Sequence, residues 1–178
     1  MSKMKSKLML AGVLVACAFG GMALSLAWAN GNAATQTTRP VFLFGTSTEV
    51  GESTLTRTDN GITMRLTVDD VPAGAYTAWI PIFGPGATDP PVTAGWVAGH
   101  VVGEGGQLTF TAHLKEGEIL SGHPMLSNGG SLTDARLQNI GMVVRSHGPA
   151  DPGRIYEQTH TFEDGVAFNY LFTRHNAP

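Results

Sequence analysis

Five side chains that can bind ligands or transfer protons are spaced along two short segments, on either side of the loop 148–154. They are Arg145, His147, Tyr156, Gln158 and His160. If the segments 139–147 and 155–162 are the strands of a hairpin, these five side chains share one face, because side chains alternate along a strand. The sequence therefore predicts a binding surface on this strip, in a register inferred from loop length alone.

The histidines of this strip also suggest a metal site. His147 and His160, with His100 or His113 from another strand as third ligand, would place neutral imidazoles on a rigid sheet, which suits Cu(II) or Zn(II). The sequence contains no HxH, HxxxH or HExxH spacing. Ordinary surface histidines, or histidines bonded to a loop backbone, are therefore the competing interpretation.

A catalytic interpretation would make His147 or His160 a general base and Arg145 an anion stabiliser, with Glu163 or Glu157 orienting the base. On a strand Glu157 would face away from His160, which weakens that arrangement. The sequence has no GxSxG elbow and no phosphate-binding loop. It favours a binding or structural module over an enzyme.

Tryptophan offers a further recognition surface. An exposed Trp79 or Trp96 at the rim of the fold would stack on a sugar ring or anchor a partner protein. Burial in the core is the competing interpretation and the commoner one in a small β domain.

Short β-type runs separated by Gly, Pro and Asp must position these residues. The expected strands are 41–44, 53–57, 62–68, 75–83, 96–102, 107–114, 139–147, 155–162 and 166–173. Two of them alternate clearly, with Ile62, Met64, Leu66 and Val68 on one inward face and Leu108, Phe110, Ala112 and Leu114 on another. This spacing predicts an all-β fold, an antiparallel β-sandwich of immunoglobulin type with eight or nine strands; a barrel is the alternative.

Charge excludes one class of partner. From Asn30 onward eight basic residues, Lys115 and seven arginines, face all 14 acidic residues, a net charge of −6. A phosphate backbone needs clustered positive charge. We therefore expect no nucleic-acid binding.

The first 29 residues have the form of a signal peptide that would be helical. A basic stretch ending at Lys7 precedes an apolar run over 8–27, and Ala27-Trp28-Ala29 offers a cleavage site before Asn30. Residues 30–39 then form a flexible lead-in and 40–175 a single domain. Two alternatives stay open: lipidation at Cys17, or an uncleaved anchor through 8–27. Cleavage before Asn30 would leave no cysteine, which excludes thiol catalysis and Cys-ligated zinc.

Three longer stretches carry a resemblance. They are GITMRLTVDDVPAGAYTAWIPIF, AGHVVGEGGQLTFTAHL and VVRSHGPADPGRIYEQTHTF. Together they resemble a group of exported bacterial β-sandwich proteins of uncharacterised function, over about residues 60–165. Relatives in this group carry cysteines where this chain has none, in 84–95 and 164–168. The stretch Ser146–Ala150 is also similar to the HGPA stretch of CHRD domains, whose fold resembles copper–zinc superoxide dismutase. Their paired HxH is missing around His147, so the similarity implies no copper ligands.

Taken together, these patterns predict an exported protein, periplasmic or extracellular. It would be a binding or structural module for a ligand of the cell envelope or the extracellular space. It would meet a membrane only through its N-terminal segment. The alternative is a His-ligated copper or zinc domain with or without an enzymatic activity.

Overall fold

The computed structural model describes residues 33–86, 88–126, 130–164 and 166–178. The signal helix, Cys17 and the cleavage site lie outside these residues. The described residues form eight strands and one short helix: β1 (Thr35–Leu43), β2 (Glu49–Thr58), β3 (Gly61–Val71), β4 (Gly74–Phe83), β5 (Pro91–Val102), β6 (Gly106–Lys115), β7 (Asn139–Ser146), α1 (Ile155–His160) and β8 (Phe168–His175). Among the described residues, no helix has the length and apolar character needed to cross a membrane.

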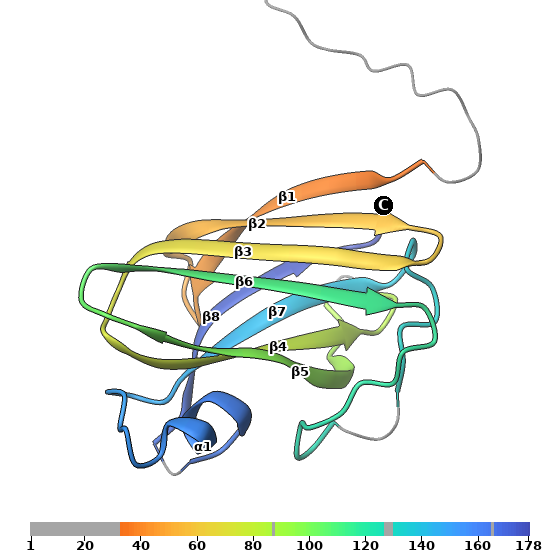
Figure 1. The fold of residues 1–178 in the computed structure, drawn as a ribbon. Helices are drawn as coiled ribbons and strands as arrows, with labels where there is room; N and C mark the ends of the chain where they lie inside the picture. The colour runs from red at the N-terminus through yellow and green to blue at the C-terminus, as the bar shows by residue number, and fades with distance from the viewer. Residues whose placement is uncertain (1–32, 87, 127–129, 165) are drawn as a thin grey trace, which may run out of the picture.

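The eight strands form one antiparallel sheet in the order β5-β4-β7-β8-β1-β2-β3-β6. A short turn over 103–105 joins the two ends of this order, β5 and β6, so the sheet is nearly closed. Figure 1 shows β2, β3 and β6 in front of β7, β8 and β4. The all-β antiparallel class is thus confirmed. The strands form a single barrel-like sheet, where the sequence had favoured two separate sheets.

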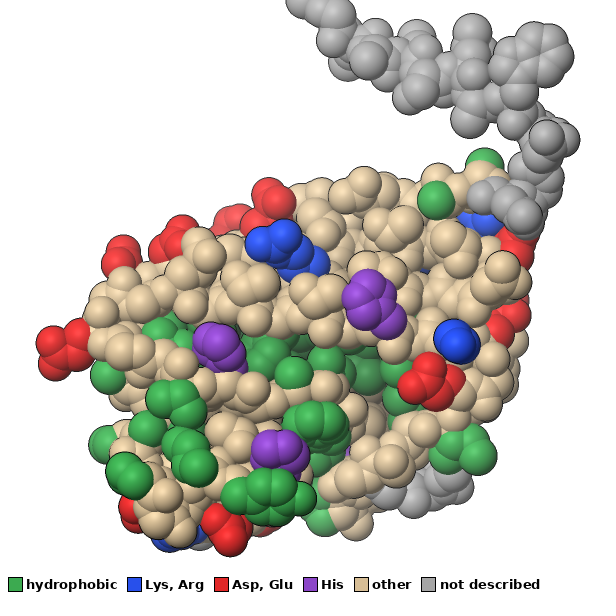
Figure 2. Space-filling model, in the orientation of Figure 1, with side chains coloured by type: hydrophobic (Ala, Val, Ile, Leu, Met, Phe, Trp, Pro, Cys, Tyr) green, Lys and Arg blue, Asp and Glu red, His purple; other side chains and the backbone are tan. Residues whose placement is uncertain are grey.

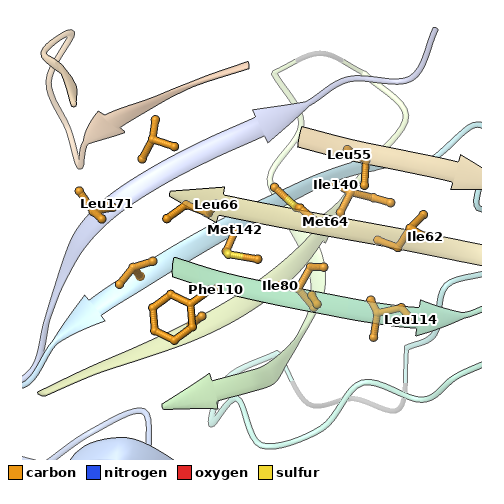
Figure 3. Packing of buried hydrophobic residues seen from close by; sticks show 14 of the residues in the cluster. Leu55, Ile62, Met64, Leu66, Ile80, Phe110, Leu114, Ile140, Met142 and Leu171 are labelled. Carbon is orange, nitrogen blue, oxygen red and sulfur yellow. The ribbon is translucent and has the colours of Figure 1, made fainter. Parts of the chain in front are cut away.

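The interior is the apolar core, because alternate residues of each strand point inward. The predicted inward faces of β3 and β6 are both buried, including Leu66 and Phe110. Figure 3 shows these side chains meeting Ile80, Met142 and Leu171 from the opposite half of the sheet. Contact between the two halves of this one sheet across the interior therefore supplies most of the apolar burial.

One end of the interior is polar. His175 is fully buried at the end of β8. Its ring nitrogens lie 2.8 Å from Thr37 Oγ1 and 2.8 Å from Ser53 Oγ. The buried Arg57 donates to the carbonyl oxygens of Ala135 and Gln138, each at 2.8 Å. Hydrogen bonds thus close the end of the core that β1, β2 and β8 surround.

The predicted lead-in 30–39 is wrong in its second half. β1 begins at Thr35, and Thr35 to Arg39 pair with Arg57 to Ser53 of β2. A segment of small polar residues has the composition of a linker. Here, however, the backbone N–H and C=O groups of these residues form hydrogen bonds with β2, which makes the segment part of the sheet.

Candidate functional site

Strand β4 is buried along its whole length, on both faces. Ala78, Ile80 and Ile82 point into the core, so Trp79 and Pro81 point to the outside of the sheet. Two segments cover that outer face, the described part of the connection 116–138, with His123, and the described part of the segment 155–167, with α1 and Phe162. Trp79 meets both, with ring centroids 5.8 Å from His123 and 5.2 Å from Phe162.

A cavity of about 540 Å³ lies beneath this cover. Its wall combines residues of β4, β5, β7 and β8 with the β1–β2 turn and the covering segments. Five aromatic side chains dominate it: Phe44, Trp79, Phe83, Phe162 and Phe172. Phe44 is also 45% exposed, so the cavity reaches the surface beside the β1–β2 turn.

Two polar side chains in the wall have unused hydrogen-bond donors. His123 is 7% exposed, and its Nδ1 accepts the backbone N–H groups of Met125 and Leu126 at 3.2 and 3.1 Å. The proton of the neutral ring therefore sits on Nε2. Burial lowers the pKa of His123, and the positive charge of Arg145 lowers it further. Asn169 accepts from Arg145 Nη1 through Oδ1 at 2.7 Å, which leaves its Nδ2 free among the described residues.

Arg145 does not line the cavity, but it contacts two residues of the cavity wall, Phe162 and Asn169. Its guanidinium carbon lies 3.9 Å from the centre of the Phe162 ring, and Nη2 donates to the carbonyl oxygen of Ala167 at 2.9 Å. Nη2 is also 3.5 Å from Glu163 Oε1. The guanidinium thus orients an aromatic wall residue and the Asn169 amide together.

His147 belongs to a separate buried chain of contacts. Trp79 Nε1 donates to Thr77 Oγ1 at 3.0 Å, and Thr77 Oγ1 lies 2.9 Å from His147 Nε2. The Asp164 carboxylate beside Nδ1 favours a ring proton on that nitrogen, so Nε2 accepts from the Thr77 hydroxyl. Nδ1 is 3.1 Å from Asp164 Oδ2, at ion-pair distance but not aligned as a hydrogen bond. Burial lowers the pKa of His147, and the Asp164 carboxylate opposes that effect.

Asp164, His147 and Thr77 thus form a carboxylate–imidazole–hydroxyl arrangement like that of enzymes with a hydroxyl nucleophile. Thr77 and His147 are 0% exposed, and the Asp164 side chain is 1% exposed. None of the three lines the cavity. We therefore assign the chain a structural role, joining β4 and β7 to the covering segment.

The predicted five-residue strip is not formed. Residues 155–160, expected as a strand, form the helix α1. Arg145, His147 and Gln158 are buried. Gln158 Nε2 donates to the carbonyl oxygens of His147 and Pro149 at 3.2 and 2.9 Å, and so ties α1 to the end of β7. A hairpin of β7 with this segment is impossible because β4 and β8 already pair with both edges of β7.

The other two members of the strip lie at the surface. His160 stacks between Tyr156 and Trp96, with ring centroids 4.4 and 5.2 Å apart. Tyr156 is 67% exposed and Trp96 38% exposed. Figure 2 shows hydrophobic side chains gathered with a histidine near α1. Of the two tryptophans considered as rim residues, Trp96 is thus at the surface, whereas Trp79 is buried.

The three histidines considered as metal ligands lie in different surroundings. His100 is exposed on β5 with its ring edge toward Phe110, His147 is buried beside Thr77, and His160 is stacked at the surface. His113 is exposed and bonds Thr63. Within the described residues, no three His, Cys, Asp or Glu side chains are grouped so as to hold a metal ion.

The cavity residues were mostly missed by the sequence interpretation. Neither Phe162 nor Asn169 was singled out, and His123 was not among the candidate site residues. One signal was available: 75–83 (AYTAWIPIF) is apolar on both faces. A strand of that kind needs cover on both sides.

Comparisons with protein-family models, with curated proteins and with solved structures give no match. The functional argument therefore depends on the geometry of the cavity.

Proposed function

We propose that this is an exported binding protein that takes a small apolar molecule into the cavity outside β4 and β7. The observation that supports this most is the size and lining of the cavity: about 540 Å³, with five aromatic side chains. Sites for small organic molecules are mostly apolar clefts of about 300–1,000 Å³ with few polar groups.

The contrast with the rest of the molecule supports binding over a purely structural role. The cavity is open to solvent beside the β1–β2 turn, so water faces its apolar walls, and replacing this water by an apolar ligand is favourable. The core inside the sheet is filled by side chains such as Leu66 and Met142. A ligand would supply the missing contacts on the outer side.

Export is the second part of the proposal, and it rests on the N-terminal pattern. The lysines ending at Lys7, the apolar run 8–27 and Ala27-Trp28-Ala29 support cleavage before Asn30. The ligand would then come from the cell envelope or the extracellular space. Sequencing the N-terminus of the protein from the envelope and secreted fractions tests this. A start at Asn30 is expected, whereas lipidated Cys17 or an intact Met1 would replace the soluble form by a membrane-attached one.

Calorimetric titration with diphenylmethane, a purely apolar probe, tests the cavity. We expect saturable binding with one site per chain. Val143→Phe, which adds a ring to the cavity wall, should weaken binding about tenfold or more because the space is then filled. Thr111→Phe is the matched control, since Thr111 is exposed on β6. Equal binding by both variants, or no binding by the unaltered protein, would refute the assignment.

A further inference from the structure

The cavity wall presents hydrogen-bond donors to its contents. His123 contributes Nε2–H, because two backbone N–H groups occupy Nδ1. Asn169 contributes Nδ2–H, because Arg145 occupies Oδ1. Neither donor has a partner among the described residues, and both atoms keep contact with solvent although the His123 side chain as a whole is 7% exposed. Each donor can therefore bond water, and a ligand oxygen in the cavity would take the place of that water.

The other polar side chains of the wall already have partners. Thr46 Oγ1 donates to the carbonyl oxygen of Leu43 at 3.0 Å and accepts from Thr48 N at 3.1 Å. Trp79 Nε1 donates to Thr77. Among the described residues that line the cavity, none carries a carboxylate. The side chains therefore offer N–H groups and no anionic acceptor.

We infer that the cavity takes an apolar molecule with a carbonyl oxygen, as in a ketone, ester or amide, which accepts hydrogen bonds from His123 Nε2 and Asn169 Nδ2. This inference rests on the proposed function and narrows the ligand class. A ligand with an ammonium group is disfavoured, because an ammonium group can only donate hydrogen bonds and the free side-chain groups of the wall are donors as well.

A neutral acceptor fits better than a carboxylate. Two arginines stack on wall residues, Arg145 on Phe162 and Arg174 on Phe83. Arg145 is 3.5 Å from Glu163 and is hydrogen-bonded to Asn169 and Ala167. Arg174 donates to the carbonyl oxygens of Asp89 and Gly86 and to Asn176 Oδ1. His123 is uncharged in this hydrogen-bond pattern, since a proton on Nδ1 would oppose both backbone donors. An anion would therefore enter an apolar space without a free counter-charge.

Four probes of one shape test the inference by calorimetric titration: diphenylmethane, benzophenone, diphenylacetate and diphenylmethylamine. We expect benzophenone to bind about tenfold tighter than diphenylmethane, because its oxygen accepts one or two hydrogen bonds from these donors, each with a modest net gain over water. Diphenylacetate and diphenylmethylamine should bind no better than the hydrocarbon. Equal affinities for all four probes, or tightest binding by the acid or the amine, would overturn the inference and leave the proposed function intact. Binding of none would overturn both.

Asn169→Asp removes the Nδ2 donor and keeps an oxygen for Arg145. We expect it to weaken benzophenone about fivefold and to leave diphenylmethane within about twofold. Asn176→Asp is the matched control: Asn176 also accepts from an arginine, Arg174 Nε at 3.1 Å, and lies outside the cavity. Unchanged preference in Asn169→Asp would count against the assigned donor.

A measurement without any variant addresses His123. In the unaltered protein, the ring ¹⁵N–¹H signal of Nε2 should shift downfield with benzophenone and hardly move with diphenylmethane. Equal shifts with both probes would contradict a hydrogen bond to the ketone.

Discussion

The two faces of β4 and β7 are both shielded from water, by different means. On the inner face, strands of the opposite half of the same sheet bring side chains such as Leu66 and Phe110 into regular contact with Ile80 and Met142 (Figure 3). On the outer face, irregular segments held at a few points leave a cavity of about 540 Å³. Regular elements interdigitate, whereas loops anchored by a few side chains span a space without filling it.

Adjacent residues of β7 offer the sharpest test of this contrast. Met142 is fully buried in the core, whereas Val143 lines the cavity. Met142→Ala should lower the free energy of unfolding by about 3 kcal/mol, and Val143→Ala by less than about 1 kcal/mol, because Val143 already lacks neighbours on one side. Urea unfolding of both variants measures this. Equal losses would mean that the outer face is packed as tightly as the core.

The second test concerns the contacts that attach the outer cover to the sheet. Thr77→Val leaves Trp79 Nε1 and His147 Nε2 buried without their shared partner, Thr77 Oγ1. We expect a loss of about 2.5 kcal/mol in the free energy of unfolding. Thr77→Ser keeps the hydroxyl and should cost far less. A valine variant as stable as the serine variant would show that the hydroxyl is not needed.

The third test uses pH to separate the polar end of the core from its apolar centre. Burial, reinforced by the charges of Arg57 and Arg39, lowers the pKa of His175 from 6.5 to about 4. Between these values the unfolded chain binds more protons than the folded one, so stability falls as the pH decreases. We expect a loss of about 2 kcal/mol between about pH 7 and pH 5, to which the lowered pKa of His147 adds in the same direction.

His175→Gln is the variant for this pH test. It removes the titrating group, so its stability should change less over the same interval. The comparison is made by urea unfolding at the two pH values. An identical slope in the variant would assign the acid sensitivity to other groups.

The smallest expected changes in stability come from substitutions on the buried and the exposed side of α1. Gln158→Ala removes three hydrogen bonds, two to carbonyl oxygens of His147 and Pro149 and one from Asp151 N. It should cost about 1.5 kcal/mol. Tyr156→Ala removes an exposed stacking contact with His160 and should stay within about 0.5 kcal/mol. Thermal unfolding of the two variants measures which substitution costs more stability. A larger loss in Tyr156→Ala would mean that the exposed stack with His160 holds α1 in place more strongly than Gln158 does.

Sequence analysis was most accurate for the strands that bury one face and expose the other face to water. Alternation over 62–68 and 107–114 correctly placed Met64 and Ala112 inside and His113 outside. It failed over 155–162, where Ile155, Tyr156 and Thr159 favour a strand by residue type. A six-residue segment has too little periodicity to decide. The structure holds the segment as a helix against the end of β7 by hydrogen bonds from the buried Gln158 to His147 and Pro149.

The cavity could not be predicted from the sequence, because it depends on contacts between segments that are far apart in the chain. Its wall combines Phe44, His123, Phe162 and Asn169, which come from distant parts of the chain. No spacing rule links them; only the strand order and the path of the covering segments do. The polar strip, by contrast, depended on a hairpin register that strand order alone excludes.

The strand order also has a consequence for the time course of folding. β8 lies between β7 and β1. The gap beside β1 can therefore close only after residues 168–175 have left the ribosome. Pairing between such distant segments is slow. Under the proposed export, this late closure keeps the chain competent for threading through a membrane channel until residues 168–175 have been synthesised.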